Sequence, residues 1–70
     1  IEAARLRSYK VRELMTQHIT TVNQDKSIRE AAQILSENRF RCLPVVNEKE
    51  ELVGIVTTYD IVSLVARESE

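Results

Sequence analysis

The chain has 70 residues, of which 43% are hydrophobic, and its ten basic and eleven acidic side chains give a net charge of −1. A chain of this length buries only about 60% of the surface that its unfolded form exposes, so we expect one small domain of marginal stability. The two signs of charge are interspersed without a basic block, which argues against nucleic acid or an anionic membrane surface as the main partner.

The residues that metal sites, disulfides and catalytic centres need are scarce in this chain. Cys42 is the single cysteine and His18 the single histidine, so we expect neither an internal disulfide nor a zinc site. The lone cysteine fits a reducing, cytoplasmic setting. No paired nucleophile and base and no glycine-rich phosphate loop stand in the sequence, so we expect no enzyme. No stretch approaches the roughly 18 consecutive apolar residues of a membrane span, so we expect no membrane-embedded segment here.

The first part of the chain predicts two helices and a strand. Residues 1–10 have the spacing of a helix that begins without a capping residue. In residues 11–16, three apolar side chains, Met15 among them, share one helical face. A helix this short is stable only when it packs, so we expect it to dock on the core with Met15 as a filler. The β-branched residues that follow predict a short strand near residues 19–22.

A well-marked helix follows the polar turn at residues 23–26. Ser27 and Glu30 have the S-x-x-E spacing of a capping box, in which each side chain satisfies the free backbone N–H of the other residue. Asn38 is a plausible helix end. The apolar residues between them recur at i, i+3, i+4 and i+7: Ile28, Ala31, Ala32 and Leu35.

Two apolar runs, residues 42–46 and 51–56, are separated by the charged turn at residues 47–50 and predict a hairpin. Both runs are continuous rather than alternating, a pattern typical of strands that are covered on both faces. Pro44 cannot donate a hydrogen bond to a neighbouring strand. The first strand of the hairpin therefore lies at an edge, or is paired on one side only near that residue.

A closing helix is expected over residues 58–68, where Ile61, Leu64 and Val65 form an amphipathic stripe. The predicted fold class is therefore α+β, in the order β-α-β-β-α, with a three-stranded sheet and two helices on one face. The second face of the sheet is also apolar and would be an association site if it were left in water. We expect the chain to cover that face by pairing with a second copy.

Three motifs carry a resemblance to a known family. A V-x-x-x-M-T opening starts at Val11, an LPVV run starts at Leu43, and a GIVT-x-x-D element starts at Gly54. Each motif alone is common, but their combination at this spacing is specific. Over residues 11–65 the chain resembles a single cystathionine-beta-synthase (CBS) repeat.

The resemblance implies a CBS repeat over residues 11–68, with residues 1–10 as a linker helix or the tail of a preceding repeat. CBS repeats work in pairs that pack sheet against sheet, and their clefts often bind AMP, ADP, ATP or S-adenosylmethionine as regulatory ligands. The second repeat would come from a homodimer or from a missing part of the same chain, and no cofactor is required. The sequence departs from the family at Glu50 and Glu51, where a glycine is common.

Thr57 and Asp60 are the main candidates for ligand binding. A threonine with an acidic residue three positions later is the ordinary way to satisfy a helix start, and this reading needs no ligand. The same helix start also attracts phosphate. By resemblance, Thr57 contacts phosphate, and Asp60 accepts hydrogen bonds from the two ribose hydroxyls.

Five further residues join the candidate site through the resemblance, and each also has a structural reading. Thr20 and Thr21 would border the cleft or serve only as strand residues. Arg41 would neutralise phosphate or be solvated, as would Arg39. Cys42 and Ile55 would line the adenine pocket or pack in the core, and Cys42 is expected to be a small buried hydrophobe.

Two functions remain in competition. The first is a regulatory module that pairs with a second CBS repeat and binds an adenine nucleotide or S-adenosylmethionine to control an attached or partner protein. The second is a structural dimerisation module whose clefts stay empty. A thermal shift with added nucleotide distinguishes the two.

Overall fold

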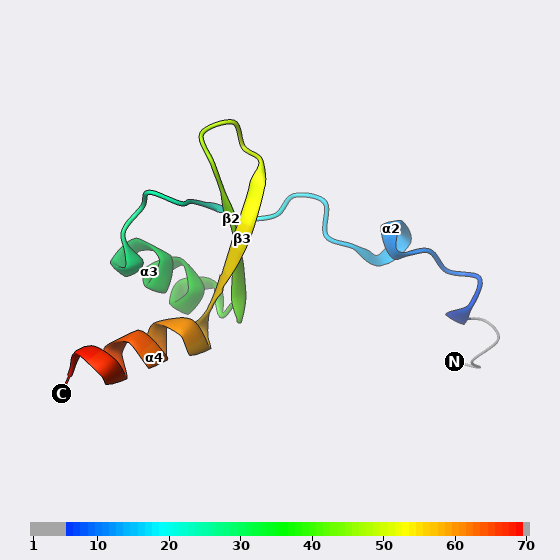
Figure 1. Cartoon of the computed structure of the whole chain (residues 1–70). Helices are drawn as coiled ribbons and strands as arrows, with labels where there is room; N and C mark the ends of the chain where they lie inside the picture. Colours follow the sequence, from blue (N-terminus) through cyan, green and yellow to red (C-terminus); the bar gives the residue numbers. More distant parts are fainter. Residues whose placement is uncertain (1–5, 70) are drawn as a thin grey trace.

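The fold is an α+β arrangement of a three-stranded sheet with helices on one face, as expected (Figure 1). A computed structural model of the chain describes residues 6–69. After a short first helix, the elements follow in the predicted order of strand, helix, strand, strand and helix. They are α2 (Val11–Leu14), β1 (Val22–Asn23), α3 (Ile28–Asn38), β2 (Cys42–Val46), β3 (Leu52–Thr57) and α4 (Thr58–Glu68).

The sheet has the order β1-β2-β3, with β2 in the centre. β1 runs parallel to β2 and pairs with it only at Val45 and Val46, whereas β3 runs antiparallel to β2 and pairs along its length. Pro44 pairs with Ile55 of β3 and lies just before the first residue that β1 contacts. The prediction that this strand is paired on one side only near Pro44 is confirmed, since the missing N–H falls where no β1 partner stands.

Helix α3 begins and ends where local chemistry predicts. The Glu30 backbone N–H donates to Ser27 Oγ at 3.1 Å, which confirms Ser27 as the cap. The Glu30 carboxylate accepts a bond from Ser27 Oγ at 3.5 Å, so only half of the expected capping box forms. Asn38 is the last helical residue, and Arg39 after it adopts a left-handed conformation with φ 56°.

The hairpin turn accommodates Glu50 and Glu51 at the place where the family commonly has a glycine. Glu50 has φ 64°, in the left-handed region that a glycine would adopt without steric penalty. Asn47 stabilises this turn, because its Oδ1 accepts bonds from the backbone N–H groups of Lys49 at 2.9 Å and Glu51 at 3.0 Å. The turn therefore keeps a glycine-like shape with a glutamate in place.

The hydrophobic core lies between the sheet and the two long helices. Its buried cluster joins Val22 of β1, Ala31 and Leu35 of α3, and Leu43 of β2. Val56 of β3 and Ile61 of α4 are half-buried against it, together with Ile34 and Val45. Figure 1 shows α3 and α4 on the same side of the sheet, so both helices cover one face, as predicted.

The opposite face of the sheet, here called the open face, is apolar and exposed. Paired residues of an antiparallel ladder point to the same side, and neighbours along a strand alternate. Because Leu43 and Val56 point into the core, the Pro44–Ile55 pair points to the other side. Ile55 is 62% exposed. The expected second apolar surface is therefore present: within residues 6–69, Ile55 is left largely exposed and Pro44 is half-buried.

The N-terminal arm, residues 6–15, differs from the prediction. The expected opening helix lies mostly outside the described residues, and residues 7–10 form a turn and irregular backbone. The short helix predicted at residues 11–16 exists as α2, but it buries no residue, so the expected docking on the core is wrong. Met15 is 52% exposed and fills no core position. Figure 1 shows the arm leaving the sheet on the side opposite to α3 and α4.

The predicted strand at residues 19–22 is also displaced. β1 begins only at Val22, so Ile19, Thr20 and Thr21 precede it and belong to no strand. These residues have a high strand preference, but they have no neighbouring strand to pair with, because the parallel pairing between β1 and β2 begins only at Val22 and Val45. The radius of gyration is 16.0 Å, whereas a compact domain of this length would have about 11 Å. The extended arm accounts for this difference.

The core is small enough for one side chain to decide its stability. Leu43 is fully buried between the sheet and both helices, so Leu43→Ala should lower the free energy of unfolding by about 2–5 kcal/mol. Leu52→Ala, at a residue that is 68% exposed, should change it by less than about 0.5 kcal/mol. Urea denaturation measures both, with an osmolyte added where a variant is unfolded without it. Equal losses in the two variants would contradict this core.

Candidate functional site

The start of α4 is a complete capping box. The Asp60 backbone N–H donates to Thr57 Oγ1 at 3.1 Å, and the Thr57 backbone N–H donates to Asp60 Oδ2 at 2.9 Å. The structural reading of the T-x-x-D spacing is therefore confirmed. It uses one carboxylate oxygen of Asp60, and within the described chain Asp60 Oδ1 accepts no hydrogen bond from another residue.

The cap also sets the charge of Asp60. The hydrogen bond from the Thr57 backbone N–H, and then the one with the Thr57 side chain, lower the pKa of the Asp60 carboxyl, and the slight desolvation that opposes them is smaller. Asp60 is thus ionised at neutral pH. An ionised carboxylate is an acceptor only, with capacity left at Oδ1 for a donor from outside the chain.

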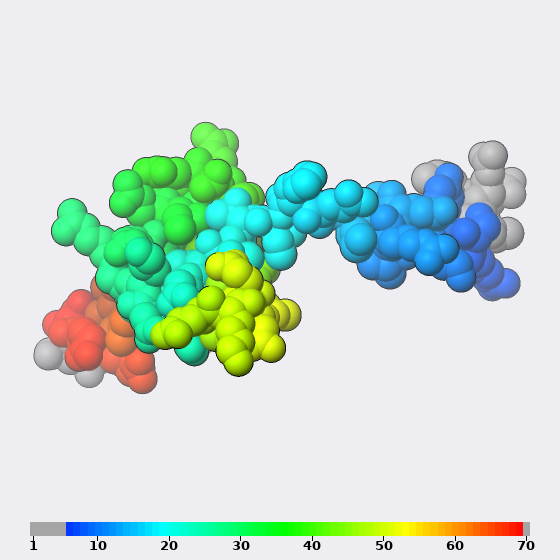
Figure 2. All heavy atoms as spheres, turned by 90° about the horizontal axis from the view of Figure 1, so that it is seen from above, coloured from blue at the N-terminus to red at the C-terminus, as the bar shows by residue number. Residues whose placement is uncertain are grey.

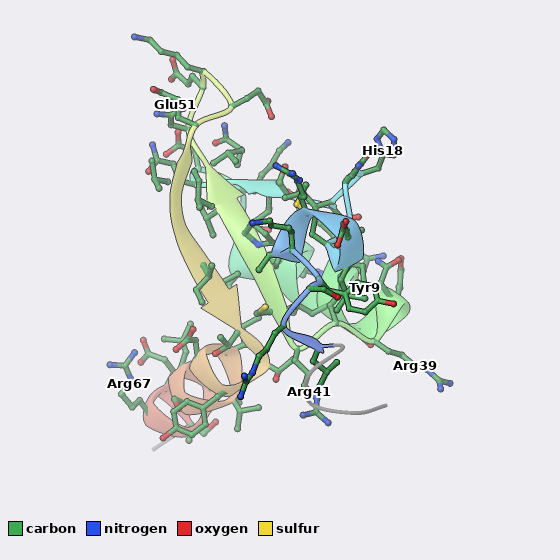
Figure 3. The ribbon with its side chains drawn as sticks, turned by 90° about the vertical axis from the view of Figure 1, so that its right-hand side faces the viewer. Tyr9, His18, Arg39, Arg41, Glu51 and Arg67 are labelled. Atoms are coloured by element: carbon green, nitrogen blue, oxygen red, sulfur yellow. The ribbon has the colours of Figure 1, made fainter. Side chains whose placement is uncertain are left out.

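The first residues of β2 lie beside this helix start. Cys42 is the ladder partner of Thr57, and the Thr58 backbone N–H donates to the Arg41 carbonyl oxygen at 3.0 Å. Arg41 itself is exposed. Figure 3 shows the Arg41 side chain at the end of the sheet where α4 begins, whereas Arg39 points away from α4. Of the two arginines considered from the sequence, only Arg41 is therefore placed beside the cap.

A shallow hollow opens on the same face of the sheet. Its volume is about 220 Å³. It is lined by Thr16, His18, Ile19, Thr20, Phe40, Cys42 and Pro44. Pro44 pairs with Ile55 and Cys42 with Thr57, so two residues of this lining have their ladder partners on β3.

Two of the candidate residues expected from the sequence, Thr20 and Cys42, line the hollow. Ile55 and Thr57 do not line it but pair with Pro44 and Cys42 in the ladder, and Asp60 lies in the cap that Thr57 begins. Thr21 is half-buried and does not line the hollow.

Two expectations at this site need correction or addition. Cys42 is exposed rather than buried, because its position in the ladder directs it to the open face together with Pro44. Pro44, Ile19 and Thr16 line the hollow, although the sequence did not mark them as site residues. Alternation along β2 was a signal for Pro44, since it lies two residues after Cys42.

Two other kinds of site are absent from the part of the chain that the structure describes. Among residues 6–69 there is no group of three or more His, Cys, Asp or Glu side chains that could hold a metal ion. In the same part of the chain, no helix has the length and apolar composition needed to cross a membrane.

Comparison with known proteins decides the family. The model of the CBS domain matches residues 11–67. The chain belongs to the CBS domain family. This CBS domain is 41% identical, over 61 residues, to a homoserine O-acetyltransferase of Methanosalsum zhilinae, and the match covers 87% of this chain but 12% of that protein. The chain thus spans a small part of this relative.

Solved structures with the same fold are CBS pairs. CBSX2 from Arabidopsis thaliana, solved in complex with AMP, is 30% identical with a TM-score of 0.83, and the match covers 96% of this chain and 51% of that chain. The CBS domain pair of protein MJ0100, in complex with 5′-methylthioadenosine and S-adenosyl-L-methionine, is 29% identical with a TM-score of 0.80. That match covers 94% of this chain and 53% of the pair. The CBS domain therefore corresponds to about half of each pair.

The cap of α4 makes stability depend on pH. The pKa of Asp60 is lowered in the folded state, so its contribution is fully present above the unfolded value of about 3.9 and is lost as the pH falls through the folded value. Asp60→Ala should therefore destabilise the domain at pH 7, and the difference from the unsubstituted chain should shrink below about pH 4. Urea denaturation from pH 7 to pH 3 checks this. A difference that is independent of pH would contradict the role of the charge.

Proposed function

We propose that this CBS domain is one half of a regulatory module, in which two repeats pair through their open faces and hold an adenosyl ligand beside α4. The observation that carries the proposal is the ionised Asp60, with Oδ1 unused, at the edge of an uncovered apolar sheet face. The partner is a second copy of this chain or another CBS repeat of the same parent chain. The repeat itself is assigned to residues 11–68, with residues 1–10 as a connection.

Each part of an adenosyl ligand finds suitable chemistry at the site. A vicinal diol such as ribose can donate to the free Asp60 Oδ1, and the Thr57 hydroxyl and the helix start suit a phosphate or another polar group at the 5′ position. The apolar side chain of Ile55 offers a surface for a flat ring. Thr20, Thr21, Arg41 and Cys42 are assigned to the rim of the cleft, Arg41 as a partner for phosphate charge.

The ligand class is supported by the related structures. CBSX2 binds AMP, the MJ0100 pair binds 5′-methylthioadenosine and S-adenosyl-L-methionine, and the cytosolic domain of the channel MgtE, 31% identical to this chain, was solved with ATP. All four ligands share an adenosine group. We therefore propose AMP, ADP, ATP or S-adenosylmethionine as regulatory ligands, with no cofactor required.

The pairing is supported by the apolar surface of the open face. A stable interface removes about 1,200–2,000 Å² from solvent in total. Since the open face carries Pro44 and Ile55, pairing through it would bury apolar area that a single copy leaves in water.

The proposed role is regulation without catalysis, in the cytoplasm. A ligand changes the state of a module only through different affinities for two arrangements, and a cleft made by two repeats provides such a difference. The module would pass this change to an attached or partner protein. The acetyltransferase relative matches over only 12% of its length, so its enzymatic name gives no reason to propose catalysis by this chain.

A ligand-free dimerisation module is the second candidate. It is favoured by the capping box, because Thr57 and Asp60 already satisfy each other and have a complete structural role without ligand. The two candidates share the open-face pairing and differ only in whether the cleft is occupied.

Ligand binding is tested by thermal shift with AMP, ATP and S-adenosylmethionine. A ligand at 100 times its Kd should add about 2.7 kcal/mol of stability, which is a shift of many degrees for a domain of this size. Asp60→Asn keeps an oxygen for the cap but removes the charge, so it should abolish most of the shift. Asp25→Asn, the same change in a turn that does not line the hollow, should keep it.

The outcomes of this assay separate the two candidates. A shift in the unsubstituted chain that is lost only in Asp60→Asn supports the ligand site. An equal shift in both variants would show that Asp60 does not bind the ligand. No shift with any of the three ligands would favour the ligand-free module.

Pairing is tested by two matched substitutions. Ile55→Glu would bury an unpaired carboxylate in the open-face interface, so it should raise the Kd of dimerisation at least about tenfold. Val65→Glu makes the same change at a similarly exposed residue of α4, on the other layer of the domain. Sedimentation velocity measures both variants. Dissociation by Val65→Glu alone would place the interface on the helices instead.

A further inference from the structure

We infer that the charged side chains around the proposed cleft select an adenosyl ligand with a negative group at its 5′ end, such as AMP or ATP, over one with a positive group, such as S-adenosylmethionine. The inference rests on the proposed function and narrows the ligand class named there. At this end of the open face a basic side chain is free, and carboxylates are scarce.

Arg41 places a positive charge beside the start of α4. Its backbone carbonyl oxygen accepts a hydrogen bond from the Thr58 backbone N–H at 3.0 Å, which holds the residue against the helix start. Figure 3 shows the Arg41 side chain at this end of the sheet. Among residues 6–69 the Arg41 guanidinium takes part in no ion pair. It is therefore available for an anionic group of a ligand.

The hollow on the open face offers no negative charge of its own. Its lining includes one histidine, His18, and no aspartate or glutamate. Asp60, at the start of α4, already accepts a hydrogen bond from the Thr57 backbone N–H at 2.9 Å through Oδ2, and the proposed function assigns Oδ1 to the ribose. No further carboxylate oxygen is left there for a positive group of the ligand.

Most other carboxylates of the described residues lie in the helix layer or at the far end of the sheet. Glu37 is on α3, which covers the other face, and its Oε1 accepts a hydrogen bond from Gln33 Nε2 at 2.8 Å. Glu68 ends α4, about 12 Å along the helix from Asp60. Five more lie at the hairpin turn, in the turn after β1 or in the first turn of α3: Asp25, Glu30, Glu48, Glu50 and Glu51.

The two ends of the sheet therefore differ in charge. Figure 3 shows Glu51 at one end and Arg41 at the other. The strand β2 runs between them, and its five residues rise about 3.3 Å each, roughly 16 Å in total. Exposed charges are screened over about 8 Å at physiological ionic strength, so the carboxylates of the hairpin act only weakly on a ligand at the start of α4.

Glu13 is the remaining carboxylate of residues 6–69, and it lies in the N-terminal arm. Figure 2 shows the arm, in blue, apart from the rest of the domain. The Glu13 carboxylate accepts a hydrogen bond from the Lys10 backbone N–H at 2.9 Å. Three basic side chains of the arm outnumber it: Arg7, Lys10 and Arg12. The described part of the arm therefore adds positive charge, not negative charge.

The candidate ligands differ in charge at their 5′ position. A phosphate monoester carries about −1.5 to −2 charges at pH 7. S-adenosylmethionine has a positive sulfonium at the same position, whereas 5′-methylthioadenosine has an uncharged sulfur there. Arg41 would attract the phosphate and repel the sulfonium, while the contacts to adenosine stay the same. Affinity should therefore fall from AMP to 5′-methylthioadenosine and then to S-adenosylmethionine.

The first test measures this order by isothermal titration calorimetry of the unsubstituted chain. AMP should bind at least about fivefold more tightly than 5′-methylthioadenosine, and S-adenosylmethionine more weakly than either. Raising the ionic strength from about 0.05 M to about 0.5 M should weaken the binding of AMP and leave that of 5′-methylthioadenosine nearly unchanged. S-adenosylmethionine binding as tightly as AMP would overturn the inference and leave the proposed function intact. No binding of any of the three would overturn both.

The second test removes the charge of Arg41. Arg41→Gln keeps the backbone carbonyl that bonds Thr58, so it should raise the Kd of AMP at least about fivefold and change that of 5′-methylthioadenosine by less than about twofold. Arg29→Gln removes the same charge from an exposed residue of α3 and should change neither Kd. An equal weakening of both ligands by Arg41→Gln, or no weakening of AMP, would overturn the role of Arg41 in selecting the ligand.

Discussion

The fold depends on a sheet that is covered on one side only. Leu43 and Val56 direct their side chains into a small core with α3 and α4, and the alternation of the strands then sends Pro44 and Ile55 to the other side. Within the described residues no third layer covers that side. The proposed pairing with a second repeat would supply such a layer, and this chain matches about half of CBSX2 and of the MJ0100 pair.

The same geometry connects stability to ligand binding. Thr57 ends β3 and caps α4, so the residue that closes the sheet also begins the helix that would face the ligand. Asp60 completes the cap with one oxygen and keeps the other for a donor from outside. A ligand that binds Oδ1 would therefore meet a carboxylate that is already oriented by the hydrogen bond from the Thr57 backbone N–H, so less rotational entropy would be lost on binding.

The success of sequence prediction varied with the range of the interactions involved. The caps at Ser27 and Thr57 were predicted correctly, because a cap depends on residues three positions apart. The continuous apolar strands correctly indicated apolar side chains on both faces of the sheet, while the covering of the second face stays a prediction. Three predictions were wrong: that residues 11–16 dock on the core, that the first strand begins at residue 19, and that Cys42 is buried. Each of them depends on which part of the fold lies next to the residue. The assignments of residues to a ligand site came from family resemblance and stay predictions, for Thr20, Thr21, Arg41, Cys42, Ile55, Thr57 and Asp60 alike.

The hairpin turn shows how a family feature can disappear without loss of shape. A glutamate held at φ 64° carries a steric penalty of about 1 kcal/mol or more, which glycine avoids. Glycine, however, loses more backbone freedom when it folds, by a similar amount. The side chain of Asn47 also accepts two hydrogen bonds within the turn. Glutamate and glycine at position 50 should therefore give the domain nearly the same stability. A search that requires glycine at this turn would overlook CBS repeats like this one.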